Sequence, residues 1–139
     1  DEGTIHIPDT KNKEPLTLPL SDVLIAILNY RLRFKTNDYV FSSRKTKYLS
    51  NPEGALKYLT ETSGIKFTFH DLRRTFITVA ESLDISAYAI KRLVNHKNGS
   101  DVTEGYIIAN HDRLRAPMQR ITDFFKENCK IEMDDYVSR

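Results

Sequence analysis

Short runs of alternating apolar and polar residues open the chain. Thr4 to Ile7 and Leu16 to Leu20 each place every second side chain on an apolar face, as a half-buried β-strand does. The segment between them is rich in Pro, Lys, Asp and Asn, which favour turns and solvent exposure. We therefore predict a β-hairpin with an exposed, positively charged tip.

A helical spacing replaces this alternation after residue 22. The segment VLIAILNYRLR carries a wide apolar stripe, and Ser21 and Asp22 precede it with oxygens suited to capping a helix. The segment NPEGALKYLTETSG predicts a second helix, with Pro52 in its first turn and Gly64 at its end. Similar patterns predict four further helices, over residues 71–83, 86–95, 101–109 and 117–130.

The remaining segments lack a helical period. NDYVF favours a short strand or an extended segment, SSRKTKYLS a polar loop, and residues 131–139 a mobile tail. Together the elements predict a mainly helical α+β fold in which the hairpin packs on the helices. At 139 residues, with 40% hydrophobic positions, the chain suits a single domain over residues 1–139.

The helix predicted from residue 117 has one apolar face. This face either joins the core or docks on a neighbouring protomer, and the core is favoured. Its members are Met118, Ile121, Phe124 and Phe125.

The segment HDLRRTF, residues 70–76, begins a helix with a histidine and two arginines. Arg73 shares a helix column with apolar residues at the edge of the buried stripe, whereas Arg74 shares one with polar residues. His70 lies three residues before Arg73, so both point to the same half-buried side. The stripe itself is predicted to consist of Leu72, Phe76, Val79 and Leu83.

A half-buried arginine needs an anion, because its guanidinium stays charged and burying it alone costs several kcal/mol. One possibility is an internal ion pair of Arg73 with Glu53 or Glu104, with His70 acting only as a helix cap. The other is a bound anionic ligand, and a phosphate suits the planar guanidinium.

The segment NHKNGSDVTEGY places His96 in a polar loop and Tyr106 ten residues later. A tyrosine in this position is more often a packing residue. A hairpin lysine, an H-x-x-R pair, a histidine and a tyrosine, in this order, nevertheless suit attack on a phosphodiester. Tyrosine has a pKa of about 10 and needs help as a nucleophile, from cations that gather phosphate charge and from a nearby base.

Composition and net charge limit the kinds of partner that the chain can bind. The net charge is only +2, so an anionic partner must meet a local basic cluster. One cysteine, Cys129, excludes an internal disulfide, and no apolar run reaches the ~20 residues of a membrane span. The amino end does not resemble a signal peptide, and it reads as a chain cut from a longer one. We expect a reduced, cytoplasmic protein that has no membrane partner.

The order of these residues resembles the tyrosine recombinases, the phage integrase family. TKNKEPLTLPL is similar to the family's hairpin and makes Lys11 the general acid. HDLRRTF resembles the family's His-x-Leu-Arg segment and carries its roles to His70 and Arg73. LVNHKNGSDVTEGY is similar to the segment that supplies the second histidine, His96, and the nucleophile, Tyr106.

The resemblance implies DNA recombination and integration through a 3′-phosphotyrosyl intermediate. It implies no metal and no nucleotide cofactor, double-stranded DNA as the partner, association with the nucleoid, and a recombination tetramer of the full-length protein. The family also uses a further arginine upstream of the hairpin, which these residues do not include, so we expect little turnover from this fragment. Asn95 stands where the family usually has glycine, and the interval from His96 to Tyr106 is one residue longer than the commonest form.

Two other interpretations come from the residues alone. FITVAESLDISAYAIKRLVNH resembles a helix-turn-helix, which predicts a noncatalytic DNA-binding module. A metal site built from His70, His96 and His111 is weaker, because their spacing matches no common zinc pattern.

Several basic residues have no catalytic role in these interpretations. Such residues usually form solvated faces, but in a DNA-binding domain they contact backbone phosphates. The predicted DNA contacts are Arg44, Lys45, Lys47, Arg74 and Lys97.

Overall fold

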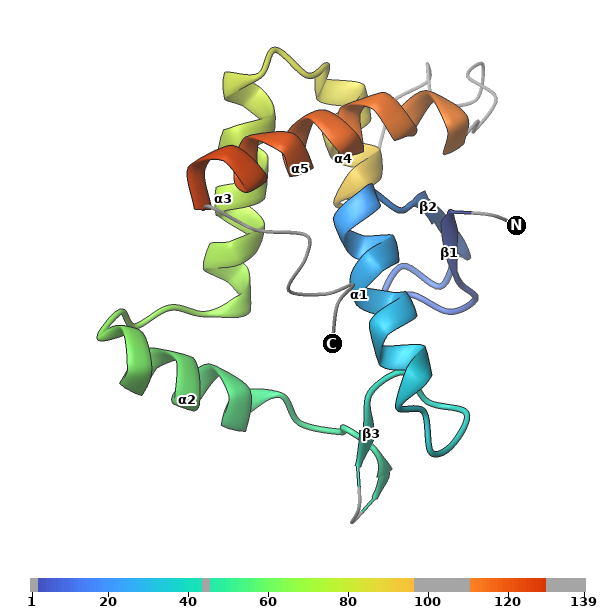
Figure 1. The fold of residues 1–139 in the computed structure, drawn as a ribbon. Coiled ribbons are helices and arrows are strands. Elements are labelled where there is room, and N and C mark those ends of the chain that lie inside the picture. Colours follow the sequence, from blue (N-terminus) through green and yellow to red (C-terminus); the bar gives the residue numbers. More distant parts are fainter. Residues whose placement is uncertain (1–2, 44–45, 97–110, 130–139) are drawn as a thin grey trace.

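Two small antiparallel sheets and five helices make up the part of the chain that the computed structural model describes, residues 3–43, 46–96 and 111–129 (Figure 1). This arrangement confirms the predicted mainly helical α+β fold. The elements, in order, are β1 (Thr4–Ile7), β2 (Leu16–Pro19), α1 (Asp22–Arg33), β3 (Ser42–Ser43), β4 (Lys47–Tyr48), α2 (Glu53–Ser63), α3 (Phe69–Ser82), α4 (Ala87–Leu93), the 3-10 turn η2 (His111–Leu114) and α5 (Arg115–Cys129).

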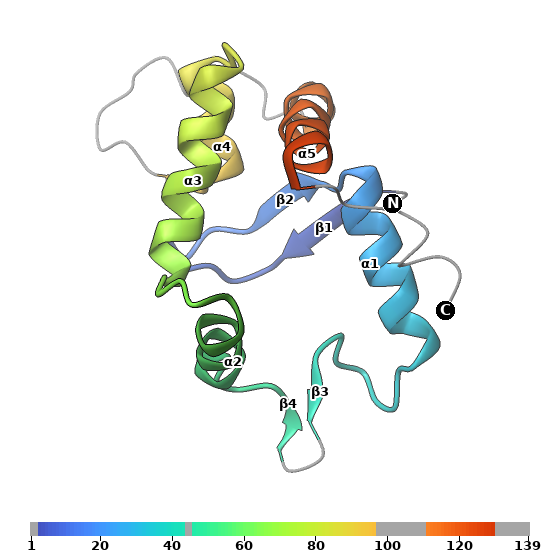
Figure 2. The same ribbon diagram turned by 60° about the vertical axis from the view of Figure 1, so that its left-hand side comes forward.

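The predicted hairpin is confirmed. Strands β1 and β2 pair antiparallel, with Thr4 opposite Pro19 and Ile7 opposite Leu16. Figure 2 shows this hairpin lying between α1 on one side and the α3–α4 pair on the other. Its tip therefore extends toward α3 and α4, so the loop between β1 and β2 can contact residues of these helices.

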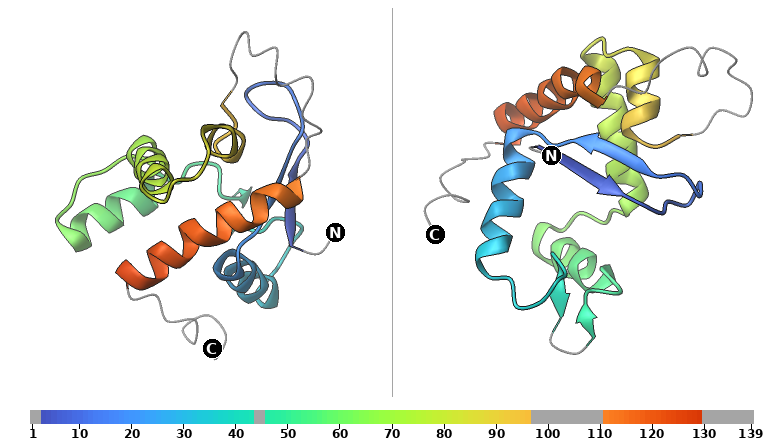
Figure 3. Two further views of the ribbon diagram at one scale, coloured as in Figure 1. Left: turned by 90° about the horizontal axis from the view of Figure 1, so that it is seen from above. Right: turned by 90° about the vertical axis from the view of Figure 1, so that its right-hand side faces the viewer.

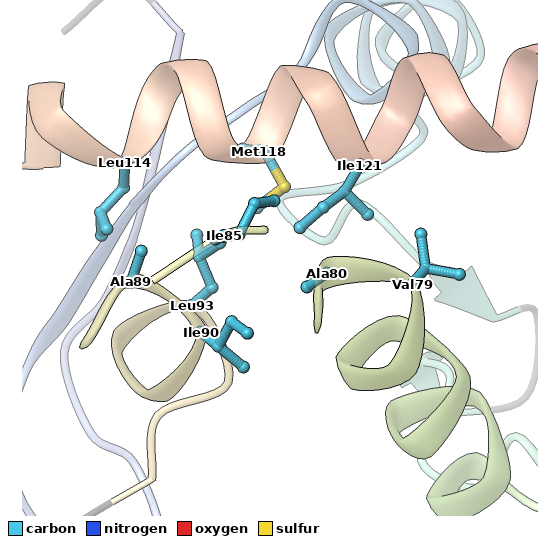
Figure 4. Packing of buried hydrophobic residues seen from close by; sticks show 9 residues of the cluster. All are labelled: Val79, Ala80, Ile85, Ala89, Ile90, Leu93, Leu114, Met118 and Ile121. Atoms are coloured by element: carbon cyan, nitrogen blue, oxygen red, sulfur yellow. The ribbon is translucent and has the colours of Figure 1, made fainter. Parts of the chain in front are cut away.

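Helix α5 is the centre of the packing. It crosses α3 and α4, as the views in Figures 1 and 3 show, and its buried side chains meet theirs (Figure 4). Met118 and Ile121 are buried in this core, and Phe124 and Phe125 pack against it, which confirms the favoured prediction for this face. The buried cluster comprises Val79, Ala80, Ile85, Ala89, Ile90, Leu93, Leu114, Met118 and Ile121.

A tight turn joins α3 to α4. The amide of Ile85 donates to the carbonyl of Ala80 at 3.1 Å, and Asp84 adopts the left-handed conformation with φ of 53°. Many helices end in this way, with one residue in the left-handed conformation, which is usually Gly or Asn. The Ser86 Oγ then accepts from the amide of Ala89 at 3.3 Å and starts α4. The predicted pair of helices flanking this turn is confirmed.

Polar bonds fix α1 against α5. Asp22 Oδ1 accepts from the amide of Val23 at 2.7 Å and from Gln119 Nε2 at 2.9 Å, and Lys126 Nζ donates to Asp22 Oδ2 at 2.8 Å. The predicted Ser21 cap is wrong, because the Ser21 side chain is buried and its Oγ has no partner among the described residues. Asp22, the other residue predicted to supply an oxygen at this helix end, does accept from the amide of Val23.

The segment predicted as a polar loop contains a second hairpin. Strands β3 and β4 pair Ser42 with Tyr48, and Asn37 Nδ2 donates to the carbonyl of Lys47 at 2.8 Å. Two-residue strands are too short to produce a periodic pattern, which explains the error. The segment NDYVF before β3 contains no strand.

Helix α2 ends as predicted and begins slightly later. Gly64 ends it in the left-handed conformation, with φ of 72°. Pro52 precedes the first helical residue rather than lying in the first turn, and its carbonyl accepts from the amide of Ala55 at 3.0 Å.

Two predicted elements, the helix over residues 101–109 and the tail over residues 131–139, lie outside the described residues. Within the described ranges, no helix has the length and the apolar character that crossing a membrane requires.

Candidate active site

The start of α3 is fixed by a reciprocal cap. The amide of Asp71 donates to Thr68 Oγ1 at 3.2 Å, and the amide of Thr68 donates to Asp71 Oδ2 at 3.0 Å. These bonds satisfy helix-end donors and start the helix at Phe69. Hydrogen bonds from Thr68 also hold the pKa of Asp71 below its ordinary value. His70 therefore lies in the first turn, and the alternative in which it caps the helix is wrong.

Arg73 and Arg74 have different surroundings, as their positions around the helix predict. Arg74 lies 3.7 Å from Asp71 Oδ1, and its side chain is 73% exposed. Arg73 is half-buried and has no ion pair or hydrogen-bonding side-chain partner among residues 3–43, 46–96 and 111–129. Glu53, the proposed internal partner, accepts from Asn51 instead, and Glu104 lies outside the described residues. Arg73 therefore has the surroundings of an anion-binding side chain.

His70 and Arg73 line one open groove of about 610 Å³. His70 is exposed, so its predicted half-buried position is wrong, whereas that of Arg73 is confirmed. The amino-terminal half of α3 forms one wall, the end of α4 forms the other, and α5 contributes one residue. Leu72 is 50% exposed on this groove, so its prediction as a core residue is wrong. The stripe becomes buried only further along α3, where α5 covers Val79. The lining residues are Phe69, His70, Leu72, Arg73, Phe76, Leu93, Val94, Asn95 and Met118.

The end of α4 positions His96. The amide of His96 donates to the carbonyl of Lys91 at 2.9 Å, and the amide of Asn95 donates to the carbonyl of Arg92 at 3.1 Å. Asn95 has φ of 52°, a left-handed conformation that glycine adopts freely and asparagine tolerates better than most residues. The same helix ending can thus form with asparagine where the resembled pattern has glycine.

His96 lies at the boundary of a second hollow. It lines a space of about 560 Å³ together with Lys91 and Glu81, and Val94 lines both this space and the groove. His96 is exposed. The structure therefore places His96 next to the groove residue Asn95, one residue beyond the helix ending.

The tip of the first hairpin reaches the same end of α4. Asn12 Nδ2 donates to the carbonyl of Asn95 at 3.1 Å and lies 3.3 Å from Asn95 Oδ1. Lys11, the neighbour of Asn12, is exposed. The fold thus brings the Lys11 loop to the helix end that carries His96, and this helix end borders the groove of His70 and Arg73.

Sequence reasoning missed Asn12 and Phe69 as members of this site. Asn12 reads as an ordinary turn residue, and only its contact across the fold shows another role. For Asn95 a signal existed, because asparagine directly after a predicted helix favours a left-handed ending.

Four predicted site residues, Tyr106, Arg44, Lys45 and Lys97, lie outside the described residues. Lys47 is exposed on β4, as its proposed contact with DNA requires. For the metal interpretation, the described residues hold no group of three His, Cys, Asp or Glu side chains arranged to bind an ion. His111 lies 3.7 Å from Asp112 instead.

Comparison of the sequence with known protein families identifies one that matches this chain. The model of the phage integrase family matches residues 1–113, which include the hairpin, His96 and the part of the groove formed by α3 and the end of α4. The chain belongs to the phage integrase family. This membership confirms the resemblance that the sequence motifs indicated.

One relative of the chain is tyrosine recombinase XerA of Pyrococcus furiosus. The two are 28% identical over 127 residues, which cover 86% of this chain and 44% of the relative. The chain thus spans less than half the length of that protein. No solved structure gives a significant match.

Proposed function

We propose that the protein recombines double-stranded DNA at specific sites, by cleaving and rejoining strands through a 3′-phosphotyrosyl intermediate. The observation that carries this proposal is the groove beside α3, where Arg73 is half-buried with no acidic partner among the described residues and His70 lies next to it. A phosphate diester supplies the missing negative charge. Membership of the phage integrase family supports the same substrate class.

The chemistry follows from the types of residue. The Tyr106 hydroxyl attacks the scissile phosphorus, a bond forms between phosphorus and the tyrosine oxygen, and the bond to the 5′ oxygen of the next nucleotide breaks. Arg73 stabilises the charge that builds on the nonbridging oxygens, and His96 hydrogen-bonds to the same phosphate. His70 accepts the tyrosine proton, and Lys11 donates a proton to the leaving 5′ oxygen.

The phosphoester bond is exchanged rather than hydrolysed, so the reaction is reversible. In the reverse step a 5′-hydroxyl attacks the phosphotyrosine and releases Tyr106, and no nucleotide cofactor is consumed. We propose that the full-length protein supplies a further arginine upstream of the hairpin, and that it works as a tetramer on two DNA duplexes.

A nicked duplex tests the proposal. Cleavage near the nick releases a short fragment that diffuses away, so the covalent protein–DNA adduct accumulates. The full-length protein should form this adduct, and Tyr106→Phe should abolish it. An adduct that persists at the wild-type level in Tyr106→Phe would refute the assignment of the nucleophile.

The second candidate function is a noncatalytic DNA-binding module. The observation in its favour is the α3–α4 pair, joined by the short turn at Asp84 and capped at Ser86. In that case the full-length protein binds duplex DNA, and neither wild type nor Tyr106→Phe forms an adduct on the nicked substrate. The same gel therefore separates the two functions.

A further inference from the structure

One long-range contact joins the tip of the first hairpin to the end of α4. Asn12 donates its side-chain amide to the carbonyl of Asn95, across 83 residues of sequence. Both residues are half-buried. The carbonyl of Asn95 belongs to the first residue after the Val94 cap of α4, so it lies outside the hydrogen-bond pattern of the helix. The contact with Asn12 gives this carbonyl a donor.

The loop that carries Asn12 needs such a contact. Strand pairing stops at Ile7 and Leu16, so residues 8–15 lie outside the ladder. Local bonds shape the loop: the amide of Lys13 donates to the carbonyl of Thr10 at 2.8 Å, and Thr10 Oγ1 donates to the carbonyl of Glu14 at 2.9 Å. Such bonds fix the shape of the loop but not its position relative to the groove.

The other end of the contact is rigid. Asn95 is held by the α4 ending, and α4 is held in the core by Ala89, Ile90 and Leu93. Lys11 directly precedes Asn12 in the chain. Asn12 therefore connects the Lys11 loop to the end of a helix that is anchored in the buried core.

We infer that Asn12 is a positioning residue, which places the Lys11 ammonium for proton donation to the leaving oxygen of the DNA strand. This inference rests on the proposed function, in which Lys11 is the general acid. Proton transfer requires hydrogen-bond reach, so a loop that moves by about 1 Å slows the step strongly. Asn12 acts through Lys11 and does not itself touch the reacting atoms.

The test compares two DNA substrates that differ in one atom. In the first, the bridging leaving atom is the natural 5′ oxygen, which leaves as an alkoxide unless it receives a proton. In the second, sulfur replaces this oxygen and leaves as a thiolate; a thiol has a pKa of about 8.5, so it departs without a proton donor. Single-turnover cleavage by the full-length protein, at saturating DNA, is measured on both.

Lys11→Ala shows how much the cleavage rate falls when the general acid is removed. Loss of a general acid slows cleavage of the oxygen substrate by about 10²- to 10⁴-fold, and the sulfur substrate should be cleaved at close to the wild-type rate. Asn12→Leu keeps the approximate shape of the side chain and removes its donor. It should slow the oxygen substrate by about 10- to 100-fold and be rescued by sulfur in the same way.

Two matched variants serve as controls. Asn95→Gly keeps the left-handed helix ending and the backbone carbonyl that accepts from Asn12, so it should cost less than Asn12→Leu. Asn128→Leu removes an equivalent amide-to-carbonyl bond of 2.8 Å, to Phe124 within α5, and should cleave both substrates like wild type.

The outcomes separate the inference from the proposed function. If Asn12→Leu is equally slow on both substrates, or as fast as wild type on both, while Lys11→Ala is rescued by sulfur, the positioning role is wrong and the proposed chemistry stands. If Lys11→Ala is not slowed on oxygen, or is not rescued by sulfur, the general-acid assignment fails, and the positioning role fails with it.

Discussion

The two ends of α3 lead into regions that differ in how they are held. The region after α3, formed by α4, η2 and α5, shares one buried cluster with the end of α3, in which Ile121 is 1% exposed. The region before α3, which we call the α2 arm (residues 34–43 and 46–64), contains no buried residue. Figure 1 shows α2 well apart from α5.

The α2 arm is held by local contacts instead. The rings of Tyr39 and Tyr48 lie 5.0 Å apart, and the Arg31 guanidinium lies 4.7 Å from the centre of the Phe41 ring. Arg31 Nε also donates to the carbonyl of Val40 at 3.0 Å. Because apolar burial is the main stabilising term in folding, a region without it opens more easily than one built around it.

Under the proposed function, this difference suits the two regions to different tasks. The groove residues His70, Arg73 and Asn95 lie on elements anchored in the core, which provides the fixed geometry that the proposed chemistry requires. The α2 arm presents Lys47 on an exposed hairpin, where the proposed phosphate contact would tolerate movement. Four experiments test the comparison, from the largest expected effect to the smallest.

Truncation in the core should have the largest effect. Ile121→Ala deletes a fully buried side chain and should lower the free energy of unfolding by about 2–5 kcal/mol. The matched change in the arm, Leu59→Ala, affects a side chain that is 47% exposed and should cost about 0.5 kcal/mol or less. Urea unfolding of both variants measures this, and equal losses would show that the arm is packed as tightly as the core.

Left-handed helix endings occur in both regions. Aspartate tolerates this conformation better than alanine, so Asp84→Ala should lower the free energy of unfolding of the main transition, by at most about 1 kcal/mol. Gly64→Ala introduces the full strain of a Cβ, which glycine lacks, at the end of α2, where the added Cβ meets no atom within 4 Å among the described residues.

Gly64→Ala should therefore speed amide hydrogen exchange in α2 and leave the main transition in place. If it shifted the main transition as far as Asp84→Ala does, the arm and the core would unfold as one unit.

The polar bonds of Asp22 in α1 to Gln119 and Lys126 in α5 should contribute a smaller, pH-dependent part of the free energy of unfolding. Hydrogen bonds from Gln119 and Lys126 lower the pKa of Asp22, and Asp22 raises the pKa of Lys126. The carboxylate thus adds stability above its ordinary pKa of 3.8, which is lost as the pH falls below that value. The ammonium adds stability below its ordinary pKa of 10.5, which is lost once the pH rises above the raised value.

Asp22→Asn should remove about 0.2–1 kcal/mol at neutral pH, as expected for an exposed pair. It should also flatten the alkaline loss of stability, whereas part of the acid loss remains because Asp71 also has a lowered pKa. Urea unfolding between pH 3 and 11 measures both, on a scale of ~1 kcal/mol. An unchanged alkaline profile would mean that the Lys126 bond does not contribute.

Charge reversal in the arm should leave stability almost unchanged. Lys47→Glu alters an exposed side chain, so the free energy of unfolding should move by less than about 0.5 kcal/mol. If Lys47 contacts a phosphate, DNA affinity falls and its logarithmic salt slope decreases by about 1. Lys57→Glu makes the same charge change on α2 and is the control; equal affinities of wild type and Lys47→Glu would remove Lys47 from the interface.

Local signals in the sequence predict much of the fold. Alternation gives the first hairpin, helical spacing gives α1 to α5 to within a few residues, and Gly64 and Ser86 mark helix ends correctly. The H-x-x-R spacing also separates Arg73 from Arg74, because two residues on one helix have a fixed angular relation. The β3–β4 hairpin escapes prediction, because its two-residue strands are too short to produce a periodic pattern.

The sequence by itself determined most of the local elements, the family and the residue types suited to phosphate chemistry, because each depends on neighbours in the chain. Only the tertiary structure decided that Leu72 lines a groove, that Arg73 has no acidic partner among the described residues, and that Asn12 meets Asn95. Burial and long-range bonds depend on how helices and hairpin pack together, and residues 83 positions apart leave no periodic trace of their contact.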